Sequence, residues 1–149
     1  MTENIEHKID RKNWNAGPWD NEPQDRTDFI HAGFSCFTLR NNLGAWCGYV
    51  GVPRDHKYYG VRYNDIDVDV HGGLTYSSLC SGAICHVPEP GMPDDVWWFG
   101  FDTAHLMDRL PHREAYFNSG TYRTLEYTQE ETRKLADQLK EANAEKTNG

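Results

Sequence analysis

The stretch Phe34-Ser-Cys-Phe-Thr-Leu-Arg-Asn-Asn-Leu-Gly-Ala-Trp-Cys-Gly-Tyr-Val-Gly-Val52 decides the fold of this chain. Apolar and polar side chains alternate as far as Arg40, and the tetrapeptide that follows, Asn-Asn-Leu-Gly, is typical of a turn. The second half is rich in β-branched and aromatic residues until Pro53, which has no N–H with which to continue a strand. The stretch therefore predicts a β-hairpin.

Two further segments of the chain resemble strands. In residues 66–71 the apolar residues Ile66, Val68 and Val70 point one way, and the polar residues Asp67, Asp69 and His71 point the other. The run from Val96 to Phe101 is apolar, has the length of a strand and ends at Asp102. We expect both segments to join the sheet, and we assume that they pair with each other.

The C-terminal part of the sequence predicts a helix over residues 128–142. Thr128 and Glu131 have the spacing of a capping box, in which each side chain satisfies a backbone N–H at the helix start. Leu135 and Leu139 lie on one stripe of this helix and should pack on the sheet. The predicted fold class is α+β: a single domain with a mainly antiparallel sheet and the C-terminal helix packed on one face.

Composition and charge limit the setting and the partners. The 149 residues predict one domain over residues 29–142, with a polar N-terminal arm (1–28) and a flexible tail (143–149). The net charge of −8 and the lack of Lys/Arg clusters argue against DNA or RNA as a partner. No apolar run is long enough for a membrane span or a signal peptide, so we expect a cytoplasmic protein. A homo-oligomer stays open.

The cysteines are expected to be free. Cys36, Cys47, Cys80 and Cys85 form no CxxC pair, and the Cys80–Cys85 spacing is not that of a zinc knuckle. In a reducing compartment such residues are usually small buried hydrophobes.

Candidate catalytic residues occur at two predicted strand ends. His71 is followed by Gly72 and Gly73, whose backbone N–H groups could face a phosphate, although the same tripeptide also forms ordinary turns. Asp102 and His105, with Asp108 three residues further on, form a metal-type or general-base set if a helix begins at Asp102. The alternative is a purely structural role, in which Asp102 caps the helix and His105 donates a hydrogen bond back to it.

The remaining candidate residues are aromatic side chains and one loop. We expect His71, Asp102 and His105 to line one cavity, with Tyr76 or Trp98 in its wall, and Trp98 to stack on a base. The loop that carries His56 and Tyr59 mixes a base with phenols and is a second candidate ligand contact, although its composition is also ordinary for a surface. A divalent metal ion fits these residue types, but the sequence does not require one.

Several strings resemble a known group of proteins. His71-Gly-Gly-Leu-Thr-Tyr76 and Trp97-Trp-Phe-Gly-Phe-Asp102, together with Trp46-Cys-Gly-Tyr-Val-Gly-Val-Pro53 and Ile84-Cys-His-Val-Pro88, are similar to a family of small, largely uncharacterised bacteriophage proteins, over about residues 44–142. The resemblance brings no established activity. It implies a setting in which small accessory proteins act on host pathways, including defence systems that signal with nucleotides.

Three functional hypotheses follow. The first is a pocket that engages a small nucleotide-type ligand and hydrolyses it in the manner of a phosphodiesterase, with His71 as base or metal ligand, Asp102 orienting it and His105 as acid or second ligand. The second is a protein that sequesters the same ligand without turnover. The third is a module that binds a host protein through its acidic surface.

Overall fold

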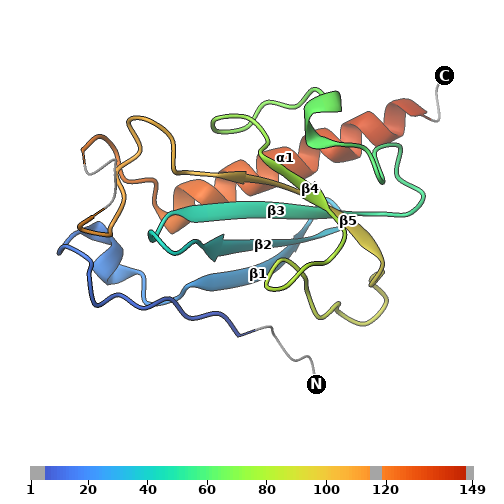
Figure 1. Ribbon diagram of the computed structural model, residues 1–149. Helices are drawn as coiled ribbons and strands as arrows, with labels where there is room; N and C mark the ends of the chain where they lie inside the picture. The colour runs from blue at the N-terminus through green and yellow to red at the C-terminus, as the bar shows by residue number, and fades with distance from the viewer. Residues whose placement is uncertain (1–5, 115–118, 147–149) are drawn as a thin grey trace.

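A computed structural model describes residues 6–114 and 119–146, and it shows an antiparallel five-stranded sheet with one long helix on one face (Figure 1). The strand order in space is β1-β2-β3-β5-β4, and every neighbouring pair is antiparallel. The strands are β1 (Arg26–His31), β2 (Phe34–Arg40), β3 (Trp46–Pro53), β4 (Tyr76–Ser78) and β5 (Val96–Asp102); the helix is α1 (Leu125–Lys146), and two short 3-10 helices are η1 (Pro18–Asn21) and η2 (Tyr63–Asp65). The predicted α+β class is confirmed, and so is the hairpin β2–β3.

Helix α1 closes the main core. Leu135 and Leu139 are fully buried, as their place on the apolar stripe predicts, and they pack against side chains of β3 and β5 such as Val50 and Phe99. Gly48 in β3 allows this close approach, because a methyl group there would collide with the Thr132 hydroxyl. No helix in the parts of the chain that the structure describes is long and apolar enough to cross a membrane.

The helix begins earlier than the sequence predicts. The backbone N–H of Tyr127 donates to the Thr124 hydroxyl oxygen at 3.1 Å, so Thr124 is the cap. Thr128 instead donates its own hydroxyl to the Thr124 carbonyl at 3.0 Å, and the expected capping box at Thr128 is wrong. The helix also continues through residues 143–146, which we had expected in the flexible tail, and the last three residues lie outside the described part.

The predicted strand over residues 66–71 is wrong, although its alternation is real. Ile66, Val68 and Val70 do turn inward onto the main core, but the segment lies beside α1 and makes no strand ladder. Its backbone is paired with helix side chains: the N–H of Asp69 donates to Gln138 Oε1 at 2.7 Å, and Gln138 donates back to the Asp69 carbonyl at 2.9 Å. The period of two therefore records an extended chain with one buried side.

The assumed pairing of residues 66–71 with the strand at 96–102 is wrong as well. β5 lies between β3 and β4, and Tyr76 of β4 stands opposite Gly100.

The N-terminal segment is attached to the sheet by buried charges. Arg40 at the end of β2 has no exposed surface, and its guanidinium lies 3.0 Å from Glu22 Oε1 and 3.3 Å from Asp25 Oδ1. Glu22 also accepts the backbone N–H of Leu125, the first residue of α1, at 2.7 Å. Trp19 is fully buried, and β1 begins at Arg26, inside the segment expected to be an arm.

The second face of the sheet is covered by the loop between β4 and β5. A cluster of Phe37, Tyr49 and Trp98 packs there against loop residues such as Ile84. Within this loop Cys80 and Cys85 form a disulfide, so the expectation of four free cysteines is wrong for these two. Cys36 and Cys47 are free and buried, as expected.

Candidate functional site

Two histidines and an aspartate converge beside the start of α1. His71 lies at the end of the extended segment 66–71, and His105 and Asp108 lie in the turn after β5. His71 Nε2 is 2.8 Å from Asp108 Oδ2, and His105 Nδ1 is 3.4 Å from the same oxygen. The two imidazole rings are 5.5 Å apart and edge to face. This set is called the His–His–Asp cluster below.

Asp108 is the centre of the cluster. Its side chain is only 2% exposed, and its oxygens accept from His71 Nε2 and from the backbone N–H of His105 at 3.1 Å, while Arg123 Nε donates to the other oxygen at 2.9 Å. Burial alone would raise the pKa of this carboxyl, but the hydrogen bonds from His71 and Arg123 outweigh it and lower the pKa below the ordinary value. Asp108 is therefore an ionised buried carboxylate.

Both ring nitrogens of His71 are engaged. Because an ionised Asp108 can only accept, Nε2 carries the hydrogen toward it, and Nδ1 forms a second hydrogen bond, of 2.8 Å, with the Tyr127 hydroxyl. Burial and the nearby Glu131 raise the pKa of Tyr127, so its phenol stays protonated. Tyr127 thus orients His71 and is no nucleophile.

His105 presents a nitrogen that lacks a hydrogen bond. Its Nδ1 is buried and makes no hydrogen bond within the described residues, although two carboxylate oxygens are close, Asp108 Oδ2 at 3.4 Å and Asp102 Oδ1 at 3.6 Å. Gly72 leaves the space that the ring occupies, because any side chain at this position would overlap the imidazole. A buried nitrogen of this kind costs free energy unless a ligand uses it.

The structure places Asp102 differently from the expectation. No helix begins at Asp102; its Oδ1 accepts the N–H of Ala104 at 3.0 Å and its Oδ2 accepts the Thr75 hydroxyl at 3.2 Å. Its contact in the site is with His105, and the carboxylate that binds His71 is Asp108.

The expected aromatic wall lies elsewhere. Trp98 and Tyr76 belong to the cluster on the face of the sheet opposite α1, whereas His71 contacts α1 through Tyr127. Trp98 is fully buried there, which leaves no surface for a stacked base. The N–H of Gly73 is used within its own turn, where it donates to the Val70 carbonyl at 2.9 Å.

His56 and Tyr59 are likewise outside the cluster. His56 is 4% exposed, and its Nε2 donates to the Leu139 carbonyl at 2.8 Å while Nδ1 accepts from the N–H of Tyr58. It joins the turn after β3 to the helix. Tyr59 donates its hydroxyl to Asp95 at 2.7 Å on the surface.

Sequence reasoning missed the helix side chains of the site. Tyr127 lies in the first turn of α1 and Arg123 lies two residues before the helix; the sequence assigns no chemistry to either, and it places Asp108 only as a helical neighbour of His105. The predicted helix starts too late, at Thr128 instead of after the cap Thr124, so the sequence does not place Tyr127 on the helix beside the site.

The cluster has the donor set of a divalent metal site. One ligand atom from each of His71, His105 and Asp108 lies within 4.8 Å of the others. Ligands of a tetrahedral zinc ion lie roughly 3.4 Å apart, given zinc–ligand distances of about 2.0–2.1 Å, so small side-chain shifts bring all three around one ion. Tyr127 would then accept the Nδ1–H of His71, as outer partners of metal-bound histidines do.

The depressed pKa of Asp108 predicts a pH-dependent stability. An aspartate whose pKa is lower in the folded state stabilises the fold above its unfolded pKa of about 3.9, and this contribution is lost as the pH falls through the folded pKa. We expect the difference in unfolding free energy between the wild type and Asp108→Asn to be constant above about pH 5 and to shrink below about pH 4. Urea unfolding in a metal chelator, across this range, measures it; a difference independent of pH would contradict the assignment.

Comparison with protein-family models, with curated proteins and with solved structures gives no match, so the function has to be inferred from the residues of the site.

Proposed function

We propose that the His–His–Asp cluster binds a divalent metal ion of the zinc class and hydrolyses a phosphate ester in a small nucleotide-type ligand. The observation that carries the proposal is the approach of three ligand atoms, from His71, His105 and Asp108, to within 4.8 Å of one another. Two imidazoles and one carboxylate leave coordination positions for water, and a bound metal lowers the pKa of that water enough to make hydroxide near neutral pH.

The surroundings supply the other groups that hydrolysis needs. Asp102 lies 3.6 Å from His105 and is 30% exposed, so it can take the proton of the attacking water. The oxygen of the water adds to phosphorus as its proton passes to Asp102, the ester P–O bond breaks, and the leaving oxygen takes that proton back from Asp102. Arg123 next to Asp108 provides positive charge for a phosphate.

The surface beside the cluster is apolar. Leu106 and Met107, between His105 and Asp108, are 73% and 66% exposed. Met107 also has a left-handed backbone with φ of 78°, which side-chain-bearing residues seldom adopt and which is found preferentially at functional sites. The exposed apolar side chains of Leu106 and Met107 could contact a nucleobase, and this supports the choice of a ligand that carries a base next to its phosphate.

The setting of the proposal is the cytoplasm of a bacterial host during phage infection. It rests on the resemblance to small phage proteins, and it makes a signalling nucleotide of host defence the first ligand class to try. Sequestration without turnover and binding of a host protein are the alternative functions that the test must separate.

The test is incubation with a panel of linear and cyclic mono- and dinucleotides and ADP-ribose, with Zn²⁺ or Mn²⁺ or with a chelator, followed by chromatography. We expect conversion of one class with metal, none with chelator and none in His71→Ala. The matched control is His31→Ala, which removes a histidine that also lies 2.9 Å from an aspartate, but that aspartate, Asp137, is 64% exposed and lies outside the cluster.

The other outcomes overturn parts of the proposal. A nucleotide that is depleted from the filtrate and recovered unchanged after heating would mean a sequestering protein and would contradict hydrolysis. No conversion and no depletion would contradict the nucleotide ligand and favour the interaction module. Activity that is lost equally in His31→Ala would show that the loss in His71→Ala is not specific to the cluster.

A further inference from the structure

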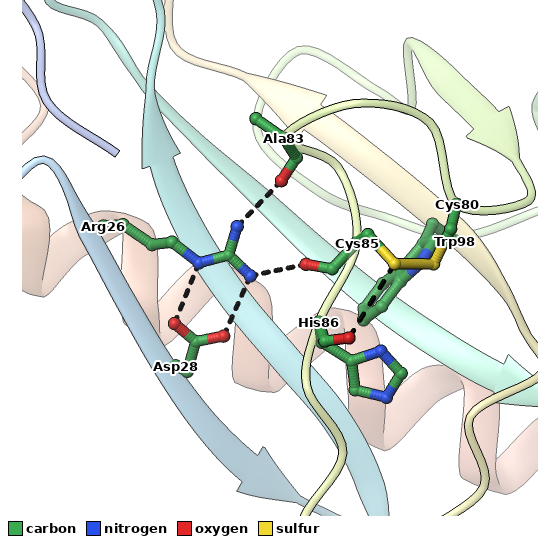
Figure 2. The surroundings of a disulfide bond; sticks show 7 residues. All are labelled: Arg26, Asp28, Cys80, Ala83, Cys85, His86 and Trp98. Carbon is green, nitrogen blue, oxygen red and sulfur yellow. Dashed lines mark hydrogen bonds and ion pairs between the residues drawn. A yellow bond between two sulfur atoms is a disulfide. The ribbon is translucent and has the colours of Figure 1, made fainter. Parts of the chain in front are cut away.

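The disulfide between Cys80 and Cys85 closes a small hairpin in the loop between β4 and β5 (Figure 2). Ser81 and Ile84 exchange two backbone hydrogen bonds of 3.0 Å, and Gly82 has the positive φ of 55° found at the first central position of type II′ turns. The Cα atoms of the cysteines are 4.6 Å apart, the usual spacing of a directly opposed pair that shares no backbone hydrogen bond. The hairpin backbone therefore places the two cysteines directly opposite each other.

A buried arginine holds this hairpin on the sheet. The side chain of Arg26 in β1 is 4% exposed, and its guanidinium donates to the Ala83 carbonyl at 2.8 Å and to the Cys85 carbonyl (Figure 2). The guanidinium is fixed in turn by Asp28 at 2.9 Å and by the ring of Phe37 at 4.0 Å. These contacts do not involve sulfur, so reduction of the disulfide breaks none of them directly.

A third ligand residue follows directly in the chain. One ligand atom each of Cys80, Cys85 and His86 lies within 4.8 Å of the others. Both ring nitrogens of His86 are buried, and within the described residues neither has a hydrogen-bond partner. The indole N–H of Trp98 donates to Cys80 Sγ at 3.3 Å, a contact that favours a thiolate at this sulfur.

We propose that the reduced protein binds a thiophilic metal ion of the zinc class through Cys80, Cys85 and His86, and that oxidation to the disulfide abolishes this site. The Cys-x₄-Cys spacing does not predict it, because the hairpin, and not a knuckle loop, places the sulfurs. The site is separate from the His–His–Asp cluster and does not depend on the function proposed for it.

A dithiol can reduce the disulfide between Cys80 and Cys85. The dithiol gives two electrons and two protons to the S–S bond and becomes a cyclic disulfide, while Cys80 and Cys85 become thiols. Metal binding then releases both thiol protons to solvent. Cys80 is exposed, so a soluble reductant reaches the bond.

The test uses Co²⁺ as a coloured substitute for zinc, added to the full-length protein after dithiol reduction and anaerobic removal of the reductant. We expect reduction of the folded protein to make two thiols reactive, those of Cys80 and Cys85. Cobalt should then give a thiolate charge-transfer absorption band in the near ultraviolet. The band should be absent from the oxidised protein and from Cys85→Ser, and His86→Ala should weaken cobalt binding at least about tenfold.

Three controls separate this site from the rest of the molecule. Burial raises the pKa of the Cys36 and Cys47 thiols to about 12, so Cys36→Ser should keep the band. Asp108→Asn should keep it too, because that residue belongs to the other cluster. Zinc should also protect Cys80 and Cys85 of the wild type from alkylation, which keeps the test valid if Cys85→Ser does not fold.

Several results would overturn the proposal. A disulfide that resists native reduction, a reduced protein without the band, a band that survives in Cys85→Ser, or full cobalt affinity in His86→Ala would each rule out the three-ligand site.

Discussion

Asp108→Asn is expected to abolish metal-dependent turnover and to weaken zinc binding at least about 100-fold, more than the roughly 10–100-fold that loss of an outer partner costs. The substitution keeps the shape of the side chain but removes the charge that a divalent ion needs between two neutral imidazoles. It also places an amide N–H against a donor, Arg123 or His71, so we expect about 1–3 kcal/mol of destabilisation. Calorimetric titration with zinc and thermal unfolding in chelator measure the two effects separately.

Asp102→Asn is the matched control for this prediction. Asp102 is a carboxylate near the same histidine, but it is 30% exposed and lies outside the three-ligand set. We expect it to keep zinc affinity within a few-fold while lowering kcat about 10²–10⁴-fold, because it is assigned to the proton of the attacking water. Equal zinc affinity in the wild type and Asp108→Asn would contradict the ligand assignment.

Arg40→Ala is expected to destabilise the protein by about 3–5 kcal/mol and to lower Tm by roughly 10 °C. The guanidinium has no exposed surface and lies between the carboxylates of Glu22 and Asp25. Its removal leaves the Glu22 carboxylate without a cation and leaves Asp25 with Arg11 alone, at 2.7 Å, and it frees Glu22 from the arrangement that also holds the first N–H of α1. Arg123 and Tyr127 flank the start of α1 and contact Asp108 and His71. A displaced helix start should therefore also lower the zinc affinity of the cluster.

The control is Arg54→Ala. Arg54 also contacts an aspartate, Asp95 at 3.3 Å, but the two side chains are 77% and 47% exposed. Exposed pairs of this kind contribute roughly 0–1 kcal/mol, so its Tm should stay within a few degrees. A loss in Arg40→Ala no larger than in Arg54→Ala, by chemical denaturation, would refute the buried-charge account.

The central hairpin and the helix were predictable because their signals are local. The hairpin between β2 and β3 shows its turn and its alternation within one short stretch, and Leu135 and Leu139 follow the period of a helix that packs on a sheet. The segment from Ile66 to Val70 shows the limit of this reasoning. Alternation reports one buried side, but it does not report whether the backbone pairs with a strand or, as here, with Gln138 of a helix.

The site was predictable in part. The histidines of the cluster, His71 and His105, were selected from their position beside strand ends and glycines, and the structure brings their rings to 5.5 Å from each other. The carboxylate partner was misassigned, because Asp102 closes its own turn through Ala104 and leaves Asp108 to bind His71.

The disulfide escaped prediction for a different reason. The pairing of Cys80 with Cys85 depends on the turn at Gly82, and a spacing rule does not report this geometry.

The most direct test of the central claim is the zinc content of the protein after equilibration with zinc and dialysis. It should be measured on a Cys80→Ser/Cys85→Ser background, so that only the His–His–Asp cluster contributes. We predict about one zinc ion per chain on this background, and close to none when His105→Ala or Asp108→Asn is added. A background protein without zinc, or zinc retained in full by both added variants, would contradict the metal site.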